Sequence, residues 1–373
     1  MLPAWRSGRR EMRLMIWLAI FSLALVACAA PETPAPSPTS AQAPDAAPTT
    51  LPPAAEELEV QLLPLPEALS NPLAQFSGMA WYGDWLILLP QYPNYFEREG
   101  SGSLVALAKA DLLQALDGAL SAPLEPYYVK LDDQGLMDQI KGFEGFECLT
   151  FHQDQAYLSI EAQPQKMLGY LVRGRVEANA DGLPLAIHLE PERLVEIQPQ
   201  AALDNYSDES CLVWNDQVIT LYEANGTHVN PAPVAHRFDL NLQPLGSLPF
   251  PNIEYRITDV APPDTEGRFW AINYLFPGDL DKLQPMETEG LDALAQQYGA
   301  GVTHAAYAVV ERLVQYEVSG DSIKLVDAPP LQLSLVSNVT ARNWEGIVRL
   351  DERGFLLVTD SFPGTLLGFV RYP

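Results

Sequence analysis

A spacing of fourteen residues recurs five times in this chain and constrains its fold more than any other feature. In each copy a polar residue opens a short apolar run, a turn-like cluster follows seven positions later, and a second polar residue closes the next apolar run. The pairs are Ser77 with Gln91, Glu147 with Glu161, Glu209 with Glu223, Asp259 with Asn273, and Glu345 with Thr359, which Asp360 follows. A hairpin that turns at its midpoint places its two ends side by side. The spacing therefore predicts five antiparallel hairpins with paired polar ends.

The five hairpins predict an all-β chain folded as a five-bladed β-propeller, with six blades as the alternative. If each hairpin supplies the two inner strands of a blade, the marked side chains form a polar ring at one mouth of a central channel. Further short apolar runs follow the hairpins and are expected to form the outer strands. Only residues 365–371 follow the last hairpin, so we expect 58–63 to pair with them and close the ring.

Two stretches carry helical rather than strand periodicity. Residues 109–120 and 290–298 place apolar residues at helical spacing, which predicts short helices on the blade connections. The insert at 277–304 interrupts the fourth blade. A long loop on a rigid scaffold either shapes a site or decorates the surface, and both interpretations stay open.

The N-terminal segment is expected to direct the protein to its location rather than to fold. Residues 1–27 have a basic start and an apolar run before Cys28, which is typical of a lipoprotein signal peptide that is cleaved before a lipidated Cys28. A short transmembrane anchor is the alternative, but the apolar run at 14–27 is shorter than the roughly 20 residues that a membrane crossing needs. Residues 28–56, rich in Pro, Ala and Thr, predict an extended tether, and 57–373 the propeller domain. We expect an exported monomer, anchored to the membrane of the cell envelope by its lipid.

The chain is strongly acidic, with 22 basic and 48 acidic residues and a formal net charge of −26. Such a surface repels phosphate backbones, which argues against a nucleic-acid partner, and it attracts divalent cations. The alternative is that most of these charges only keep an exported protein soluble.

Besides Cys28, the chain has two cysteines, Cys148 and Cys211. Export permits a disulfide between them. They lie one and two positions past their hairpin openings, so strand alternation is expected to point them to opposite sides. We therefore predict two buried free thiols.

The polar ring at the predicted mouth is dominated by carboxylates. Its candidate metal ligands are Glu147, Glu161, Glu209, Glu223, Asp259, Glu345 and Asp360. Like charges at close range raise one another's pKa, and a bound divalent cation relieves the repulsion. Oxygen-only ligands with flexible geometry favour calcium, and Gln91 and Asn273 offer neutral oxygens. The alternative is that some of these side chains accept hydrogen bonds from backbone amides of neighbouring blades.

Other catalytic chemistry has little support in the sequence. The chain has no Gly-x-Ser-x-Gly elbow, no His-Glu-x-x-His zinc helix and no phosphate-binding glycine loop. His228 is the histidine best placed for a mouth, although a loop histidine is more often a surface residue. Ser207 and Ser210 flank acidic residues but have no identifiable base. The predicted role of Trp81, Trp214 and Trp344 is packing between blades.

Three segments resemble the propeller family described as phytase-like with esterase-like activity. That family shows Asn or Asp, an aromatic residue, Glu-Gly-Ile or Glu-Gly-Leu, a turn, and a strand ending in Ser-Asp-Asp. The matching segments are Asn343-Trp344-Glu345-Gly346-Ile347 with Thr359-Asp360-Ser361, Phe146-Glu147-Cys148-Leu149, and Ile257-Thr258-Asp259-Val260. Cys148 replaces the usual Gly, Thr359 the Ser, and Ser361 the second Asp. The resemblance covers most of 57–373 and implies ester or phosphoester hydrolysis, with Glu147, Asp259, Glu345 and Asp360 as candidate ligands or mouth residues.

Three functions are therefore open. The first is a lipid-anchored hydrolase of phosphoester or carboxylic ester bonds, in which calcium polarises the ester and Glu147 or Glu209 acts as general base. The second is a non-catalytic propeller that binds a partner at the cell surface. In the third, the mouth carboxylates only stabilise the blades.

Overall fold

The computed structural model describes residues 52–96, 100–120, 122–283, 292–307, 309–337 and 340–372. They belong to one compact unit that spans Thr50–Pro373. The predicted signal peptide, the lipidation site Cys28 and most of the predicted tether lie outside the described residues. Within these ranges no helix is long and apolar enough to cross a membrane.

The strands of the described residues form four sheets, and dividing the 8-stranded sheet between β6 and β10 gives five groups of mainly antiparallel strands, which we call blades. The first blade contains β3 (Phe76–Tyr82), β4 (Trp85–Pro90), β5 (Ser103–Ala108) and β6 (Tyr127–Asp132). The second contains β7 (Phe143–His152), β8 (Gln155–Ala162), β9 (Leu168–Ala178) and β10 (Pro184–Ile197). The third contains β11 (Asp208–Trp214), β12 (Gln217–Tyr222), β13 (Val234–Asp239) and β14 (Pro244–Pro249).

The last two blades take strands from both ends of the unit. The fourth contains β15 (Arg256–Val260), β16 (Arg268–Leu275), β17 (Val310–Ser319), β18 (Ser322–Leu325), β19 (Leu331–Leu333) and β1 (Glu57–Leu58). The fifth contains β20 (Trp344–Leu350), β21 (Gly354–Thr359), β22 (Leu367–Arg371) and β2 (Val60–Leu63).

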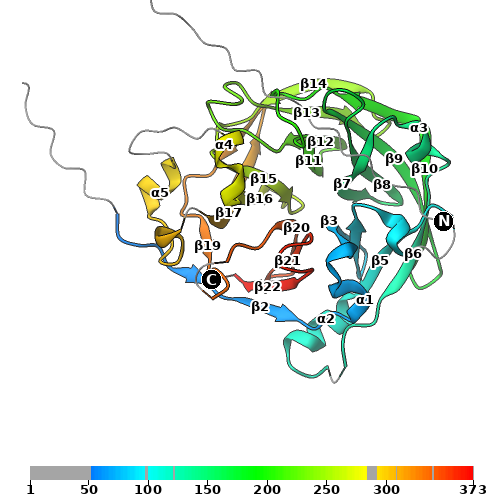
Figure 1. Cartoon of the computed structure of the whole chain (residues 1–373). Coiled ribbons are helices and arrows are strands. Elements are labelled where there is room, and N and C mark those ends of the chain that lie inside the picture. The colour runs from blue at the N-terminus through cyan, green and yellow to red at the C-terminus, as the bar shows by residue number, and fades with distance from the viewer. Residues whose placement is uncertain are drawn as a thin grey trace, which may run out of the picture. The chain divides into compact units, whose positions relative to one another are not determined.

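The first strand of each blade contacts the first strand of the next. β3 contacts β7, β7 contacts β11, β11 contacts β15, β15 contacts β20, and β20 contacts β3. The inner strands therefore surround a common axis, as Figure 1 shows. The predicted all-β propeller is confirmed. Because strand pairing and inner-strand contacts follow the fourteen-residue spacing, each marked pair lies at one end of its hairpin.

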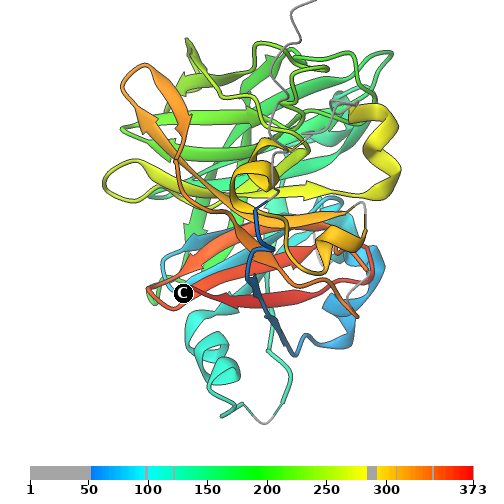
Figure 2. The ribbon, with the colours of Figure 1, turned by 90° about the vertical axis from the view of Figure 1, so that its left-hand side faces the viewer.

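The predicted closure by the N-terminal strand is confirmed. β2 pairs antiparallel with β22, with Val60 opposite Val370. β1 pairs parallel with β19, with Glu57 opposite Gln332, so the N-terminal segment contributes to two blades (Figures 1 and 2). A second connection was not predicted: β10 pairs parallel with β6 and joins the first two blades into one 8-stranded sheet.

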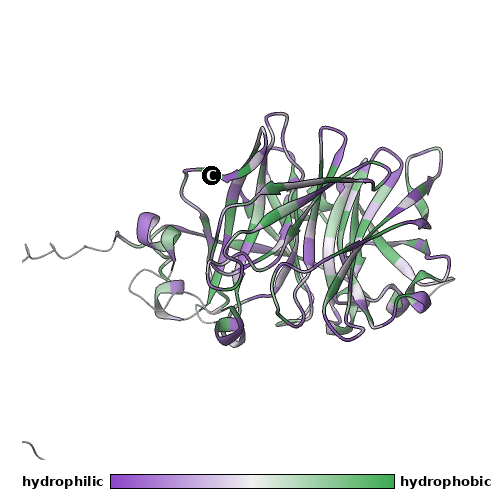
Figure 3. Cartoon of the chain, turned by 90° about the horizontal axis from the view of Figure 1, so that it is seen from above, coloured by the Kyte–Doolittle hydropathy of each residue, from purple (hydrophilic) through white to green (hydrophobic). Residues whose placement is uncertain are grey.

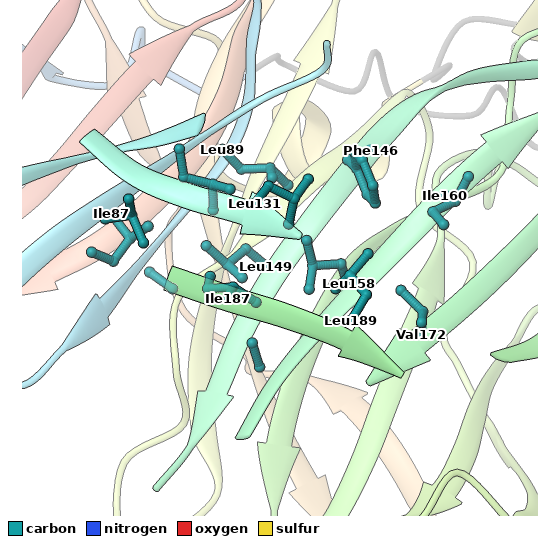
Figure 4. Close-up of a cluster of buried hydrophobic side chains, with 14 of the residues drawn as sticks. Ile87, Leu89, Leu131, Phe146, Leu149, Leu158, Ile160, Val172, Ile187 and Leu189 are labelled. Carbon is teal, nitrogen blue, oxygen red and sulfur yellow. The ribbon is translucent and has the colours of Figure 1, made fainter. Parts of the chain in front are cut away.

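Apolar side chains fill the spaces between neighbouring blades. Figure 3 shows apolar residues recurring along the strands. Between the first two blades, Ile87 and Leu89 of β4 pack with Phe146, Leu158 and other buried residues (Figure 4). Burial of such side chains contributes roughly 1.5–3 kcal/mol each. Trp81, Trp214 and Trp344 lie in clusters that combine residues of adjacent blades, which confirms their predicted packing role.

The helices are short and lie on connections between strands. They are α1 (Glu67–Ser70), α2 (Lys109–Leu116), α3 (Leu136–Gln139), α4 (Leu280–Leu283) and α5 (Ala293–Tyr298). Short 3₁₀ turns occur at Pro72–Ala74, Pro93–Phe96, Pro277–Asp279 and His304–Ala306. Both predicted helices are present, although α2 ends before residue 120 and the start predicted for α5, at 290–291, lies outside the described residues.

The prediction of two free thiols is wrong. Cys148 of β7 and Cys211 of β11 form a disulfide between adjacent blades, with Cα atoms 5.8 Å apart. Strand alternation failed as a guide because both strands are irregular at this point. Cys148 lies where the pairing of β7 shifts between Phe146 and Leu149, and the pairing of β11 shifts just before Cys211. A bulge changes which side the next side chain faces.

Candidate axial pocket

In each blade, the pairing between the first and second strands shifts register at the marked residue of the first strand. In each of β3, β7, β11, β15 and β20, the regular pairing with the second strand skips the marked residue. The marked residues skipped in this way are Ser77, Glu147, Glu209, Asp259 and Glu345, and the pairing also skips Cys148 in β7 and Thr258 in β15. β-Bulges occur often beside active sites, where they redirect a side chain. Here they occur at the same level of all five blades.

These irregular openings surround a pocket of about 130 Å³. It is lined by Ser77, Gln91, Glu147, Glu161, Asn205, Glu209, Arg256, Asn343, Glu345 and Asp360. Every lining residue has a polar side chain. The structure thus brings together five of the seven carboxylates expected at the mouth, whereas Glu223 and Asp259 do not line the pocket. Its volume suits a small polar group rather than a drug-sized ligand, which needs about 300 Å³ or more.

Arg256, which sequence reasoning missed, lies among the carboxylates of three blades. Its Nη2 lies 3.6 Å from Glu209 Oε2 and 3.3 Å from Glu345 Oε1. Its Nε donates a hydrogen bond to Glu223 Oε1, and its Nη1 lies 3.8 Å from Asp279 Oδ2. The Arg256 side chain is only 13% exposed. A buried guanidinium with this many carboxylate neighbours compensates charges that would otherwise repel one another.

Two of the predicted mouth carboxylates have structural partners instead. Glu223 is fully buried, pairs with Arg256 and does not line the pocket. Asp259 Oδ2 accepts a hydrogen bond of 2.8 Å from the backbone N–H of Ile347 in the next blade. This is the alternative that the sequence left open for such residues, and it connects β15 to β20.

The neutral residues of the fourteen-residue pairs also differ in role: some line the pocket, and others hold the backbone in place. Gln91 lines the pocket, and its Nε2 donates to Glu147 Oε1 at 3.1 Å. Asn273 donates to the carbonyls of Glu254 and Arg256, which fixes the backbone that carries Arg256. Thr359 donates through Oγ1 to the carbonyl of Gly364 and thereby holds the turn after β21.

Among the described residues of the insert at 277–304, one lies at the site. Asp279 ends the 3₁₀ turn at its start and lies near Arg256, as the ion-pair distance shows. His228 is exposed and does not line the pocket. Asn205 and Asn343 line it but were not predicted, because they lie outside the fourteen-residue spacing.

Burial raises the pKa of the pocket carboxyls. Burial is the largest cause for Glu147 and Glu209, whose pKa values lie well above the usual range, and neighbouring carboxylates raise that of Glu147 further. Burial also raises the pKa of Glu161 and of Glu345 to about 7, and the charge of Arg256 limits both shifts. Although burial opposes its charge, the nearby carboxylates raise the pKa of Arg256, which therefore stays protonated.

These shifts predict that the protein becomes less stable as pH rises from about 5 to 7.5. A carboxyl with a raised folded-state pKa keeps its proton where the unfolded chain has lost it, so its stabilising contribution is full below the unfolded pKa and disappears as pH rises through about 7 for Glu161 and Glu345. Urea midpoints across this window measure the slope. Glu161→Gln is expected to flatten it, whereas Glu352→Gln, at an exposed turn, is expected to leave it unchanged. Stability that rises over the same window would contradict the assignment.

The fit of calcium to the pocket can be judged from its oxygens. The donor set is all oxygen, as calcium prefers, and Glu161 Oε1, Asn343 Oδ1 and Asp360 Oδ1 are buried without a hydrogen-bond partner in the protein. Their spacing does not form a cage: within the described ranges no three His, Cys, Asp or Glu residues are arranged to hold a metal ion. Arg256 already supplies positive charge. We therefore derive no step through calcium, and calcium binding stays a prediction.

The fold and the pocket together define an all-β propeller with an acidic site at one end of its axis. Comparison with known protein families and with curated proteins finds no match.

Three of the solved structures that match this chain are distant likenesses. The aldose sugar dehydrogenase from Escherichia coli is 11% identical, with a TM-score of 0.40 and coverage of 83% of this chain and 98% of the other. An exo-beta-1,3-galactanase from Phanerochaete chrysosporium is 8% identical, with a TM-score of 0.45 and coverage of 83% and 64%. The xylan beta-1,4-xylosidase from Bacillus halodurans C-125 is 10% identical, with a TM-score of 0.43 and coverage of 82% and 54%. At scores this low, the fold assignment rests on the strand pairing.

Proposed function

We propose that the protein is an exported, lipid-anchored propeller hydrolase that cleaves ester bonds at its axial pocket. The observation that carries this proposal is the convergence of five carboxyl groups and one guanidinium on a small, wholly polar pocket. The resemblance of the segments around Glu147 and Glu345 to the phytase-like esterase family supports it. The disulfide supports export, because such bonds persist in oxidising compartments.

The pKa shifts suit two of the pocket carboxyls to different catalytic roles. Burial and neighbouring carboxylates raise the pKa of Glu147 well above its usual range, which suits this residue to act as general acid, with Gln91 holding its Oε1. Glu345 has a pKa of about 7 and accepts a hydrogen bond from Arg256, so it is suited to act as general base. A base is most effective when its pKa lies near the working pH. This revises the sequence-based choice of Glu147 or Glu209 as base.

These two carboxyls accept and donate every proton that ester hydrolysis moves. Glu345 removes a proton from water as the water oxygen bonds to the ester carbonyl carbon. The carbon–oxygen bond to the leaving alcohol then breaks, and Glu147 donates its proton to that alcohol. Glu209 and Glu223 hold the guanidinium of Arg256 in place, and Arg256 orients Glu345. The products are an acid and an alcohol, and the two carboxyls exchange their proton states with solvent.

A carboxylic ester fits the electrostatics better than a phosphoester. The pocket is lined by five carboxyl groups and one arginine, so it disfavours the binding of an anionic substrate. A phosphoester substrate therefore requires a cation such as calcium to offset the charge.

Turnover of p-nitrophenyl butyrate and p-nitrophenyl phosphate, each with and without calcium, tests the proposal. We expect hydrolysis of the carboxylic ester without added metal. Glu345→Gln and Glu147→Gln are each expected to lower kcat by about 100-fold or more, because each removes one proton transfer. Glu352→Gln, at an exposed turn, controls for the loss of a charge.

Two outcomes would overturn this proposal. Absence of turnover of both substrates by the folded protein, with and without calcium, would favour the non-catalytic binding propeller. Full activity in both glutamine variants, with unchanged circular dichroism, would remove the assigned roles.

A further inference from the structure

The pocket carboxyls differ in whether they make a direct ion pair. Arg256 pairs with Glu209, Glu223 and Glu345. Glu161 and Asp360 line the same pocket and have no ion pair with Lys, Arg or His among the described residues. We call these two residues the acidic subsite.

Two oxygens of the acidic subsite are left without a donor. Glu161 is only 2% exposed, and its Oε1 makes no hydrogen bond within the protein. Asp360 accepts hydrogen bonds through Oδ2 from Ser361 and Asn343, but its Oδ1 is likewise buried and unpaired. Buried acceptors are normally satisfied, and an orphan acceptor in a pocket calls for a ligand that donates hydrogen bonds.

Aromatic side chains follow the same strand ends. Tyr92 comes directly after Gln91, and the charges of Glu147, Glu161 and Asp360 contribute, after burial, to raising the pKa of its phenol. Phe362 is two residues after Asp360 and is 43% exposed. Its ring contacts that of Phe276, which is 37% exposed, with centroids 5.7 Å apart. Tyr92 and Phe362 thus stand on segments that directly follow the pocket-lining residues Gln91 and Asp360.

We propose that the acidic subsite binds the primary ammonium group of an ester substrate whose apolar part rests on Tyr92 and Phe362. This inference rests on the proposed hydrolase and names its substrate class. A primary ammonium group carries a positive charge, which suits carboxyls that have no ion pair. It also has three N–H donors, which suit carboxyl oxygens that have no hydrogen-bond partner.

Ammonium fits the spacing better than the other cations. Calcium needs oxygens that close around it at 2.3–2.6 Å, and the described carboxylates form no such group. N–H···O hydrogen bonds span about 2.7–3.2 Å and so reach oxygens that stand farther apart. A quaternary ammonium group offers no donor to the unpaired oxygens. The acceptor-rich lining disfavours an anion.

Binding of simple probes tests the subsite separately from catalysis. At about pH 7.5, n-butylamine is expected to raise Tm in a concentration-dependent way, whereas 1-butanol and sodium butyrate at the same concentrations are not. Glu161→Gln is expected to weaken amine binding about tenfold or more, because it removes one charged acceptor. Asp360→Asn provides a second variant if Glu161→Gln does not fold. Glu352→Gln is expected to bind like the wild type.

A matched substrate pair tests the connection to hydrolysis. Phenylalanine ethyl ester and ethyl 3-phenylpropanoate differ by one amino group. We expect kcat/KM to be about tenfold or more higher for the amine, and this ratio to shrink in Glu161→Gln.

The outcomes distinguish the two proposals. Amine binding without turnover of any ester would keep the subsite and overturn the hydrolase. Turnover with no preference for the amine, or a rise of Tm with calcium chloride but not with n-butylamine, would overturn the ammonium subsite.

Discussion

Replacing Arg256 with methionine is expected to lower the free energy of unfolding by about 3–5 kcal/mol, the usual cost of removing one partner from a buried ion pair. The guanidinium lies within ion-pair distance of Glu209, Glu223, Asp279 and Glu345. Without it, the buried carboxylates among these residues must either remain charged and unpaired or take up protons. The loss is therefore expected to be larger at about pH 8 than at about pH 5.

Urea unfolding of Arg256→Met at both pH values measures this effect. Arg256→Lys retains a charge but loses the planar arrangement of donors, so we expect a smaller loss of stability. Combining Arg256→Met with Glu223→Gln is expected to restore part of the stability, because the fully buried Glu223 is the carboxylate that accepts from Nε. An Arg256→Met protein as stable as the wild type at both pH values would show that the guanidinium is not the charge centre of the site.

Removing the disulfide is expected to have an effect of similar size. Cys148 and Cys211 are separated by 63 positions, and closing a loop of that length restricts the unfolded chain by roughly 4 kcal/mol in the chain-entropy treatment. The bond also connects β7 and β11 next to Glu147 and Glu209. We therefore expect Cys148→Ser/Cys211→Ser to lower stability and to reduce turnover through looser placement of these carboxyls.

Reductant provides the matched control for the disulfide. The wild type with dithiothreitol is expected to approach the urea midpoint of the double serine variant, whose own midpoint is expected to be insensitive to reductant. If dithiothreitol leaves the wild-type midpoint unchanged after complete thiol labelling has shown reduction, the stabilising role is wrong.

The sequence predicted the level of each site residue along its strand better than the direction of its side chain. The fourteen-residue spacing placed Glu147, Glu209 and Glu345 at one mouth, where the structure has them. The same spacing included Asp259, whose carboxylate instead accepts from Ile347 of the neighbouring blade. Spacing fixes where the hairpin ends meet, but the register shifts decide where the side chains point.

The misassigned cysteines and the missed arginine have related causes. In regular strands, the alternation of side chains would point Cys148 and Cys211 to opposite sides. The bulges in β7 and β11 change the side that each cysteine faces, so the two can form a disulfide. Arg256 was missed because the spacing was read only for oxygen-bearing side chains. It stands three residues before Asp259 at the start of β15, where an excess of buried carboxylates calls for a cation. The signal that could have identified Arg256 was a basic residue within a few positions of a marked carboxylate.

The pairing of β1 and β2 with strands from the other end of the unit bears on how this protein is made. Residues 57–63 are synthesised before the first three blades, yet their partners β19 and β22 are synthesised after them. The first three blades draw on neighbouring segments and have all their strands before β19 and β22 are made. The two remaining sheets must stay incomplete until those strands are available, and so must the ring of inner strands that forms the pocket. A partly synthesised chain therefore lacks a formed site.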